Sequence, residues 1–125
     1  MKLLIDTHVL LWWLDDPALL SKDARSAIQN GRNTIYVSAA VTWEIMIKQS
    51  LGKLKMPDTL DQVLKVNRFS ELSITVPHTL TLQTLPVHHR DPFDRILVAQ
   101  ALCEELTIIS RDANIQKYSV AYLLA

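Results

Sequence analysis

Acidic side chains in four separate segments of this chain have the chemistry to bind a divalent cation. The four are Asp6, Glu44, Asp94 and Asp112. A fifth acid, Asp91, stands three residues before Asp94 in the stretch HHRDPFDRILVAQA. Carboxylates gathered in a small space raise one another's pKa, and a bound cation relieves their repulsion. Oxygen ligands favour Mg²⁺ or Mn²⁺ over zinc, and such a site suits metal-assisted hydrolysis of phosphodiester bonds.

Each acid also has an ordinary structural role open to it. Asp6, Asp91 and Asp112 each precede a helical pattern that they can cap, and Asp94 is placed where the helix dipole favours a carboxylate. Glu44 can pair with Lys48 one turn later, which is worth ~0.2–0.5 kcal/mol. However, the apolar neighbours in VTWEIMI predict a largely buried helix, in which a carboxylate needs a partner or a metal. The two interpretations remain open for each acid taken alone.

The elements that must position these acids are short apolar strands alternating with helical patterns. We expect strands at residues 2–5, 34–38, 72–76, 107–109 and 119–123. We expect helices at residues 7–14, 21–30, 39–51, 58–68, 78–83 and 92–105, with a helical turn after Asp112. Strands this apolar are buried on both faces, as in parallel sheets. The pattern predicts one domain over residues 1–125, an α/β/α sandwich with a central parallel sheet.

The acids fall where a parallel sheet places its ligands, outside the carboxyl ends of its strands. Asp6 directly follows the first expected strand, and Glu44 lies in the helix after the second. Asp91 and Asp94 open the helix before the fourth strand, and Asp112 follows that strand. We therefore expect acids from four segments to converge at one edge of the sheet.

The composition excludes several classes of protein. Thirteen basic and thirteen acidic side chains in 125 residues leave no net charge, which argues against a strong, indiscriminate nucleic-acid binder. Two glycines and no glycine-rich loop argue against a nucleotide-binding loop. No apolar run approaches the ~18 residues of a membrane span. The single cysteine, Cys103, is expected to be buried and to form no internal disulfide, so we expect a cytoplasmic protein.

Four stretches together resemble the PIN domain family, most closely the VapC-like ribonuclease toxins of type II toxin–antitoxin pairs. They are DTHVLLWWL, SAAVTWEIMIK, HHRDPFDRILVAQA and IISRD, and the similarity spans essentially the whole chain. The resemblance implies a parallel five-stranded sheet between helices and Mg²⁺- or Mn²⁺-dependent endoribonuclease activity. It implies that Asp6, Glu44, Asp94 and Asp112 are the catalytic metal cluster, with Asp91 as an additional acid. It also implies an RNA substrate, a small cognate antitoxin and a homodimer.

Other side chains near the acids are candidates for substrate or partner contacts. Ser110 matches a small hydroxyl residue that the family carries two positions before its fourth acid. The cations Arg90, Arg95, Arg111, Lys48, Lys53 and Lys55 either bind RNA or are ordinary solvated charges. Trp12 and Trp13 point about 100° apart on a helix, so we expect one of them to face a partner helix in an apolar groove. His8, near Asp6, is expected to be structural, whereas His88 and His89 invite a role as general bases.

Two alternatives compete with the nuclease interpretation. A signalling receiver domain has a similar length and binds Mg²⁺ through acids at strand ends, but it needs paired acids after its first strand and an acid after its third. Here Asp6 stands alone, and LSITV is followed by Pro77. The other alternative is a non-catalytic interaction domain whose acids only cap helices.

Overall fold

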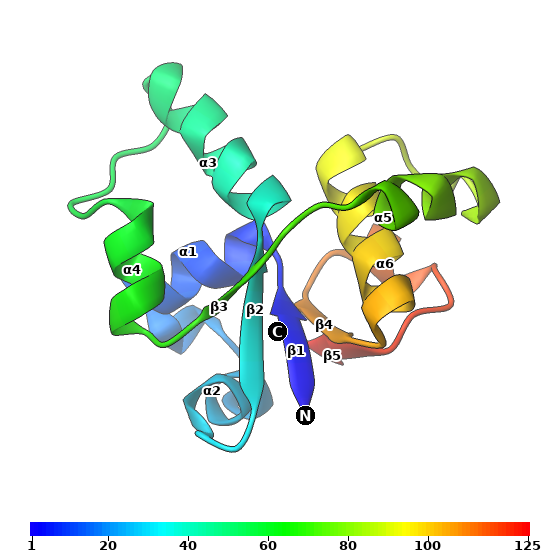
Figure 1. Ribbon diagram of the computed structural model, residues 1–125. Helices are drawn as coiled ribbons and strands as arrows, with labels where there is room; N and C mark the ends of the chain where they lie inside the picture. The colour runs from blue at the N-terminus through cyan, green and yellow to red at the C-terminus, as the bar shows by residue number, and fades with distance from the viewer.

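The computed structural model describes residues 1–125 and has a five-stranded parallel sheet at its centre (Figure 1). Its strand order is β3-β2-β1-β4-β5, and every neighbouring pair is parallel. The strands are β1 (Lys2–Ile5), β2 (Thr34–Ser38), β3 (Ser70–Leu72), β4 (Thr107–Ser110) and β5 (Tyr122–Leu124). The parallel sheet expected from the apolar runs is confirmed.

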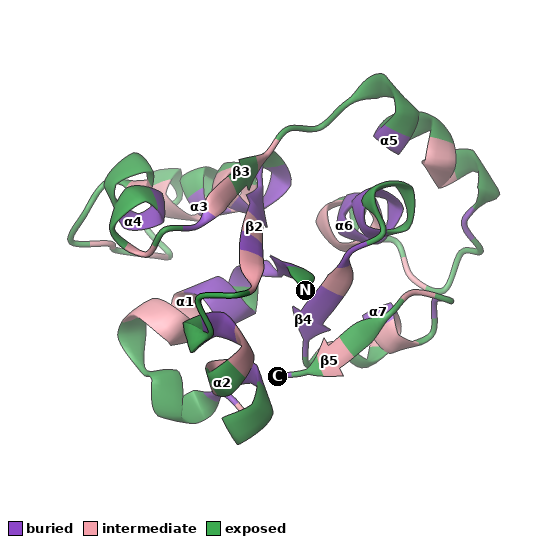
Figure 2. Cartoon of the chain, turned by 60° about the horizontal axis from the view of Figure 1, so that its bottom comes forward, coloured by how far each residue is buried: buried purple, intermediate pink, exposed green.

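Helices cover both faces of this sheet. The α-helices are α1 (Thr7–Asp15), α2 (Lys22–Gln29), α3 (Ala39–Ser50), α4 (Leu60–Val66), α5 (Val76–Thr81), α6 (Pro92–Glu104) and α7 (Ala113–Gln116), with 3₁₀ turns at Pro17–Leu19 and Leu82–Thr84. Figure 2 shows α1 to α4 on one side of the sheet and α5 and α6 on the other. The core between these layers is one cluster of 27 buried apolar residues, in which Leu3, Leu4 and Ile5 of β1 are fully buried. The predicted three-layer sandwich is therefore correct.

The strand order locates the functional edge of the sheet. The chain runs outward from β1 to β2 and β3, then crosses the sheet to β4, which pairs with the free side of β1. Ligands of open parallel sheets bind where the order reverses, outside the carboxyl ends of the strands. Here that place is the end of β1 and β4. A receiver domain has the strand order 2-1-3-4-5, so the receiver interpretation does not fit this sheet.

Several expected boundaries are wrong, and proline explains the largest error. The third strand was expected at residues 72–76 but lies at Ser70–Leu72, and Val76 begins α5. Pro77 opens this helix, because the first helical turn has no need of its missing N–H. The helix expected to begin at Asp58 begins at Leu60, after Thr59. The last strand lies at Tyr122–Leu124 instead of 119–123.

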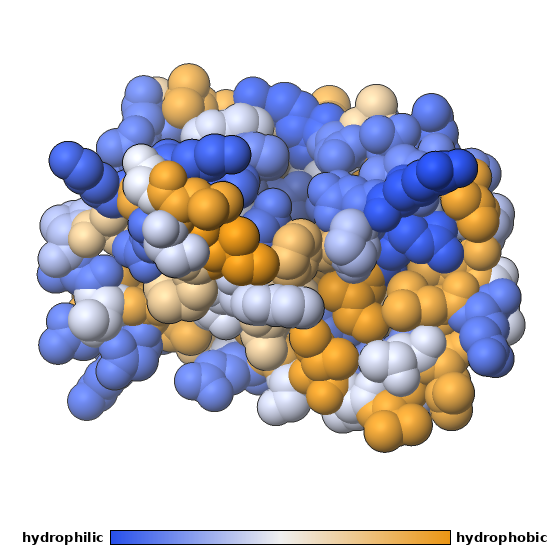
Figure 3. Space-filling model, turned by 90° about the horizontal axis from the view of Figure 1, so that it is seen from above, coloured by the Kyte–Doolittle hydropathy of each residue, from blue (hydrophilic) through white to orange (hydrophobic).

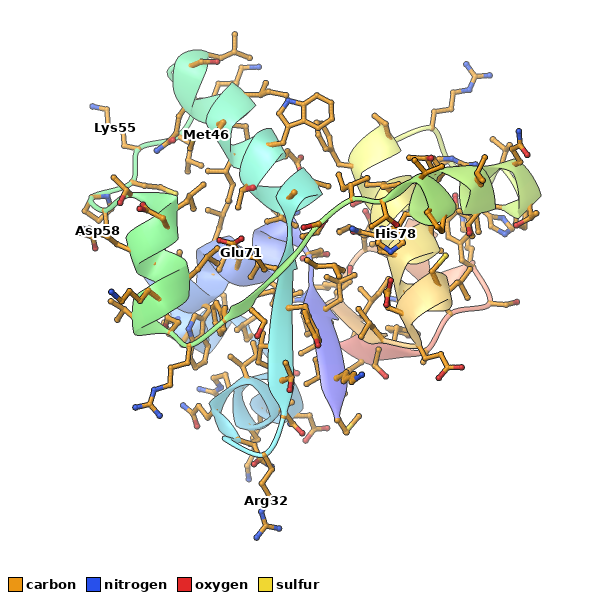
Figure 4. All side chains as sticks on the ribbon, in the orientation of Figure 1. Arg32, Met46, Lys55, Asp58, Glu71 and His78 are labelled. Carbon is orange, nitrogen blue, oxygen red and sulfur yellow. The ribbon has the colours of Figure 1, made fainter.

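Two side chains, Cys103 and His78, lie at the contact between α5 and α6. Cys103 is exposed, not buried, and its Sγ lies 2.9 Å from the Thr81 hydroxyl. His78 belongs to α5, contacts α6 through Glu104 and is 1% exposed (Figure 4). Its Nδ1 accepts a hydrogen bond from the Thr75 N–H at 3.0 Å, and its Nε2 lies 2.9 Å from the Glu104 carboxylate. None of the helices is long and apolar enough to cross a membrane.

Candidate metal centre

Three of the five acids cap helices, as their ordinary interpretation predicts. Asp6, Asp91 and Asp112 are the N-caps of α1, α6 and α7. In each of them Oδ1 accepts from a backbone N–H in the following turn, at 2.9, 2.9 and 2.8 Å respectively. Because capping uses Oδ1 alone, it leaves the other oxygen of each carboxylate for a second role. Capping and metal binding are therefore compatible.

Asp94 is the most crowded charge of the cluster. It lies in the first turn of α6, with its side chain 17% exposed. Burial, the neighbouring charges of Asp91, Asp112 and Asp6, and a hydrogen bond with the Asp112 carboxyl together raise the pKa of its carboxyl to about 8, with burial the largest cause. At neutral pH Asp94 therefore holds a proton close to Asp112. Asp6 and Asp112 therefore lie near enough to Asp94 to influence its charge, at the end of β1 and β4, but the three are not close enough to share one ion.

Asp6 is held by buried polar groups. Its exposure is 4%, and burial raises the pKa of its carboxyl, although hydrogen bonds from the Ser110 hydroxyl and the Val9 N–H oppose that rise. Ser110 is itself fully buried, and its Oγ accepts from the Asp112 N–H at 3.0 Å. The Ser110 hydroxyl thus joins two acids of the cluster and has no surface to offer a substrate.

Glu44 lies at the margin of this cluster. Its Oε1 accepts a hydrogen bond from the Thr7 hydroxyl at 2.5 Å, and its Oε2 lies 3.6 Å from Lys48 Nζ. Thr7 directly follows Asp6, so the hydroxyl ties α3 to the start of α1. Glu44 is not among the charges that shift the pKa of Asp6 or Asp94. Its side chain is 19% exposed, so it is less buried than the apolar pattern predicted.

The donor set fits a magnesium ion held by few protein ligands. No lysine or arginine forms a salt bridge with Asp6, Asp94 or Asp112. No group of three or more histidine, cysteine, aspartate or glutamate side chains is close enough to share one ion. Mg²⁺ keeps several waters and binds through one or two carboxylates plus phosphate oxygens. The arrangement suits an open site of that kind and argues against a closed cage.

A pocket of about 290 Å³ adjoins the acids and is lined by Asp6, His8, Trp12, Arg111 and Asp112. The Arg111 guanidinium lies 4.5 Å above the centre of the Trp12 ring, and its Nε donates to the Ala125 carbonyl at 2.9 Å. Its Nη2 also donates to the Leu19 carbonyl. Arg111 therefore stands as a fixed cation beside the acids.

Two of the other expected substrate cations, Arg95 and Lys48, are already engaged. Arg95 Nη1 donates to the Pro86 carbonyl and to the Tyr118 hydroxyl, both at 3.0 Å. Lys48 pairs with Glu44, whereas Arg90 and the lysines at positions 53 and 55 are exposed and form no salt bridge. Sequence reasoning missed Thr7 and Tyr118. Thr7 could have been found because it directly follows Asp6 in the sequence. Nothing in the spacing of the residues indicates a role for Tyr118.

The three tryptophans differ in how far they are exposed. Trp12 and Trp13 are both partly buried, and Trp13 donates to Asn67 Oδ1 at 3.0 Å, so neither faces fully outward. Trp43 of α3 is 60% exposed, with its edge against Phe93. Figure 3 shows the molecule from above, onto the carboxyl edge of the sheet. On this face hydrophilic residues lie between patches of hydrophobic residues.

Two further hollows lie away from the acids. One of about 370 Å³ lies beside α1 and is lined mainly by apolar residues, including Leu11, Trp12, Leu54 and Met56. The prediction that a partner helix docks beside α1 requires a hollow of this kind. The other, of about 640 Å³, lies between α3 and α4, and Met46, Asp58 and Glu71 are among its lining residues (Figure 4).

Comparison with known proteins identifies the family. None of the curated proteins compared with the chain matches it. Among solved structures, VapBC2 from Rickettsia felis, bound to a DNA fragment from its promoter, matches with a TM-score of 0.73 at 15% identity, covering 98% of each chain. FitAcB from Neisseria gonorrhoeae matches with a TM-score of 0.68 at 17% identity, covering 98% of this chain and 96% of that one. VapBC-1 from nontypeable Haemophilus influenzae matches with a TM-score of 0.63 at 14% identity, covering 98% and 97%. These likenesses show a shared fold, and the PIN domain model matches residues 3–121, so this chain belongs to the PIN domain family.

Proposed function

We propose that this chain is a Mg²⁺- or Mn²⁺-dependent endoribonuclease and the toxin of a toxin–antitoxin pair. The observation that carries the proposal is the crowding of Asp6, Asp94 and Asp112 without a salt bridge to lysine or arginine. Crowded carboxylates cost stability unless a cation relieves them, so a site that retains them has a use for that cation. Membership of the PIN family and the VapBC and FitAB neighbours support the same function.

Each residue of the cluster has a proposed task. Asp94 and Asp112 would hold the ion with Asp6 beside them, and Glu44 and Asp91 would add negative charge around it. When bound, the ion supplies an activated water and neutralises charge on the phosphate. Within the chain, the Ser110 hydroxyl fixes two of the acids, which we propose as its role in place of substrate contact.

RNA would be held by local charge, because the chain has no net charge to attract it. We propose that Arg111 contacts a phosphate beside the acids, since its guanidinium lines the same pocket as Asp6 and Asp112. Lys48 lies one helical turn from Glu44 and would meet the strand on the α3 side. Arg95 is not proposed to contact RNA, because its Nη1 is engaged with Pro86 and Tyr118 inside the fold.

We further propose that a small antitoxin binds the apolar groove beside α1. An amphipathic helix buries its apolar face in such a groove. Mutating Trp12, which lines the groove, should weaken antitoxin binding. We also propose the homodimer that the family resemblance implies. Light scattering of the purified chain tests it.

Cleavage of RNA by matched charge variants tests this function. Asp6→Asn removes one charge but keeps the helix cap, because asparagine caps as well as aspartate does. Asp16→Asn is the control, since Asp16 also caps a helical turn and accepts from the Ala18 N–H, but on the exposed surface. We expect Mg²⁺-dependent cleavage by the wild type and by Asp16→Asn, and its loss in Asp6→Asn. Absence of cleavage in the wild type, together with an unchanged melting temperature in millimolar Mg²⁺ or Mn²⁺, would favour the non-catalytic alternative.

A further inference from the structure

We infer that Arg95, Tyr118 and His89 form a hydrogen-bonded chain that positions the Asp94 carboxylate for metal binding. This inference rests on the proposed function of Asp94 and adds three positioning residues to it. Arg95 Nη1 lies 3.0 Å from the Tyr118 hydroxyl, which lies 2.9 Å from His89 Nδ1. On the other side of the ring, His89 Nε2 lies 3.4 Å from Asp94 Oδ2.

The chemistry of the donors fixes the direction of this chain. Arginine only donates, so the Tyr118 oxygen accepts from it. The Tyr118 proton is then free to point to His89 Nδ1, which accepts it. With Nδ1 acting as an acceptor, a neutral His89 carries its proton on Nε2, and that N–H faces Asp94. The chain therefore selects one imidazole tautomer, the one that donates to the Asp94 carboxylate.

Packing holds the chain in place. Tyr118 is 4% exposed, and the His88 and Tyr118 rings pack edge to face with their centres 4.7 Å apart. The same Arg95 nitrogen also donates to the Pro86 carbonyl, which ties the loop before α6 to the helix. The His89 side chain is only 12% exposed. Because Tyr118 and Arg95 are held by these contacts, the His89 ring bonded to Tyr118 keeps one orientation.

Asp94 needs such a support more than the other acids do. Asp6, Asp91 and Asp112 are oriented by the backbone N–H groups that they cap. His89 is the one basic side chain within hydrogen-bonding distance of the Asp94 carboxylate. Groups that orient metal-binding side chains are commonly worth about 10–100-fold in metal affinity or activity. The distance of 3.4 Å is long for an N–H···O bond, and catalytic hydrogen bonds often shorten when ligands bind.

Nitrogen NMR of the imidazole rings tests the tautomer without requiring catalysis. In the wild type we expect long-range ¹H–¹⁵N spectra at about pH 8 to show His89 protonated on Nε2 and bare on Nδ1, with the signal assigned by its loss in His89→Gln. In Tyr118→Phe, which keeps the ring and removes the hydroxyl, we expect a mixture of the two tautomers. A wild-type ring protonated on Nδ1 or on both nitrogens, or a spectrum unchanged in Tyr118→Phe, would overturn the inference.

A pair of isosteric variants tests the link to Asp94. The amide nitrogen of His89→Gln reaches the place of Nε2, whereas that of His89→Asn lies near Nδ1 and cannot reach Asp94. We expect His89→Gln to bind Mn²⁺ and cleave RNA close to wild type, and His89→Asn to lose about 10-fold in Mn²⁺ affinity and in kcat with KM for RNA unchanged. Equal behaviour of the two variants, with equal melting temperatures, would show that His89 does not act through Asp94.

These outcomes separate the two proposals. A wild type that shows the Nε2 tautomer but never cleaves RNA would contradict the proposed function and leave the hydrogen-bonded chain intact. A wild type that cleaves RNA but shows the other tautomer would contradict the chain alone. If Tyr118→Phe fails to fold, the Gln and Asn pair, read by Mn²⁺ affinity, decides the matter.

Discussion

Asp94, in the first turn of α6, shares a hydrogen bond with Asp112, the N-cap of α7, although each residue ionises readily in water. The bond requires a proton between the two carboxyls, and burial keeps that proton in place. A divalent cation bound to the same two groups would have to displace it. The proton and the metal therefore compete for the same carboxyl groups. As a result, both metal affinity and the stability of the fold depend on pH.

Asp94→Asn should stabilise the protein in the presence of a chelator. The pKa of Asp94 is about 8 in the folded chain against a usual 3.8, so between these values the folded state binds more protons than the unfolded state. The free energy of unfolding contributed by this group therefore falls as pH rises from about 4 to about 8. Near pH 8 the variant should be more stable by several kcal/mol, since the pKa is raised by roughly four units and one unit is worth at most about 1.4 kcal/mol. Urea unfolding across this range measures it, and a gap between variant and wild type that does not change with pH would contradict it.

Divalent ions should stabilise the wild type more strongly at higher pH. Metal binding must release the Asp94 proton, so affinity should rise as pH approaches about 8 and level off above it. An ion at 100 times its Kd adds about 2.7 kcal/mol to the free energy of unfolding. Melting temperatures in Mg²⁺ or Mn²⁺ at several pH values measure the effect, with Asp94→Asn as the control that should not respond. An equal response of both proteins would place the ion elsewhere.

Thr7→Val should slow RNA cleavage because it releases Glu44. The Thr7 hydroxyl donates to the Glu44 carboxylate, and valine keeps the shape of threonine without the donor. We expect a fall in kcat of about 10-fold, as for other groups that orient metal-site residues, and a loss of about 1 kcal/mol in stability. Thr7→Ser keeps the hydroxyl and should behave like the wild type. If Thr7→Val retains full activity, Glu44 does not need this support.

His78→Phe should destabilise the protein without changing cleavage. The buried ring accepts from the Thr75 N–H and contacts Glu104, so its removal leaves a buried donor unpaired. Such a loss costs about 1–3 kcal/mol. His78→Asn can still accept from Thr75 and should lose less. Denaturant unfolding and kcat under conditions where both variants are folded check this, and a large fall in kcat would point to a coupling between α5 and the acidic cluster.

The sheet, and the placement of Asp6 and Asp112 at one edge of it, were predictable because their signals are local. Apolar runs mark β1, β2 and β4, and the rule for parallel sheets places Asp6 and Asp112 at a common edge. The third strand was not predictable to the residue. LSITV has the β-branched residues of a strand, but only Ser70–Leu72 pairs with β2, and Pro77 suits a helix start equally well.

The rest of the site could not be read from periodicity. Cys103 lies on a helix that is apolar on most faces, so the pattern does not show which side meets solvent. Tyr118 follows α7 and His89 precedes α6, and their contact depends on how two irregular segments pack. Spacing carries no information about such contacts. The pairing of Glu44 with Lys48, by contrast, follows from their separation of four residues on one helix.

The most direct test of the central claim is diffraction from crystals soaked in Mn²⁺, collected where manganese scatters anomalously. We predict a strong anomalous peak between the carboxylates of Asp94 and Asp112, within bonding distance of at least one oxygen of each, and its disappearance in crystals of Asp94→Asn. A Mn²⁺ peak bound elsewhere on the chain, or an empty acidic cluster at saturating Mn²⁺ and mildly alkaline pH, would contradict the account.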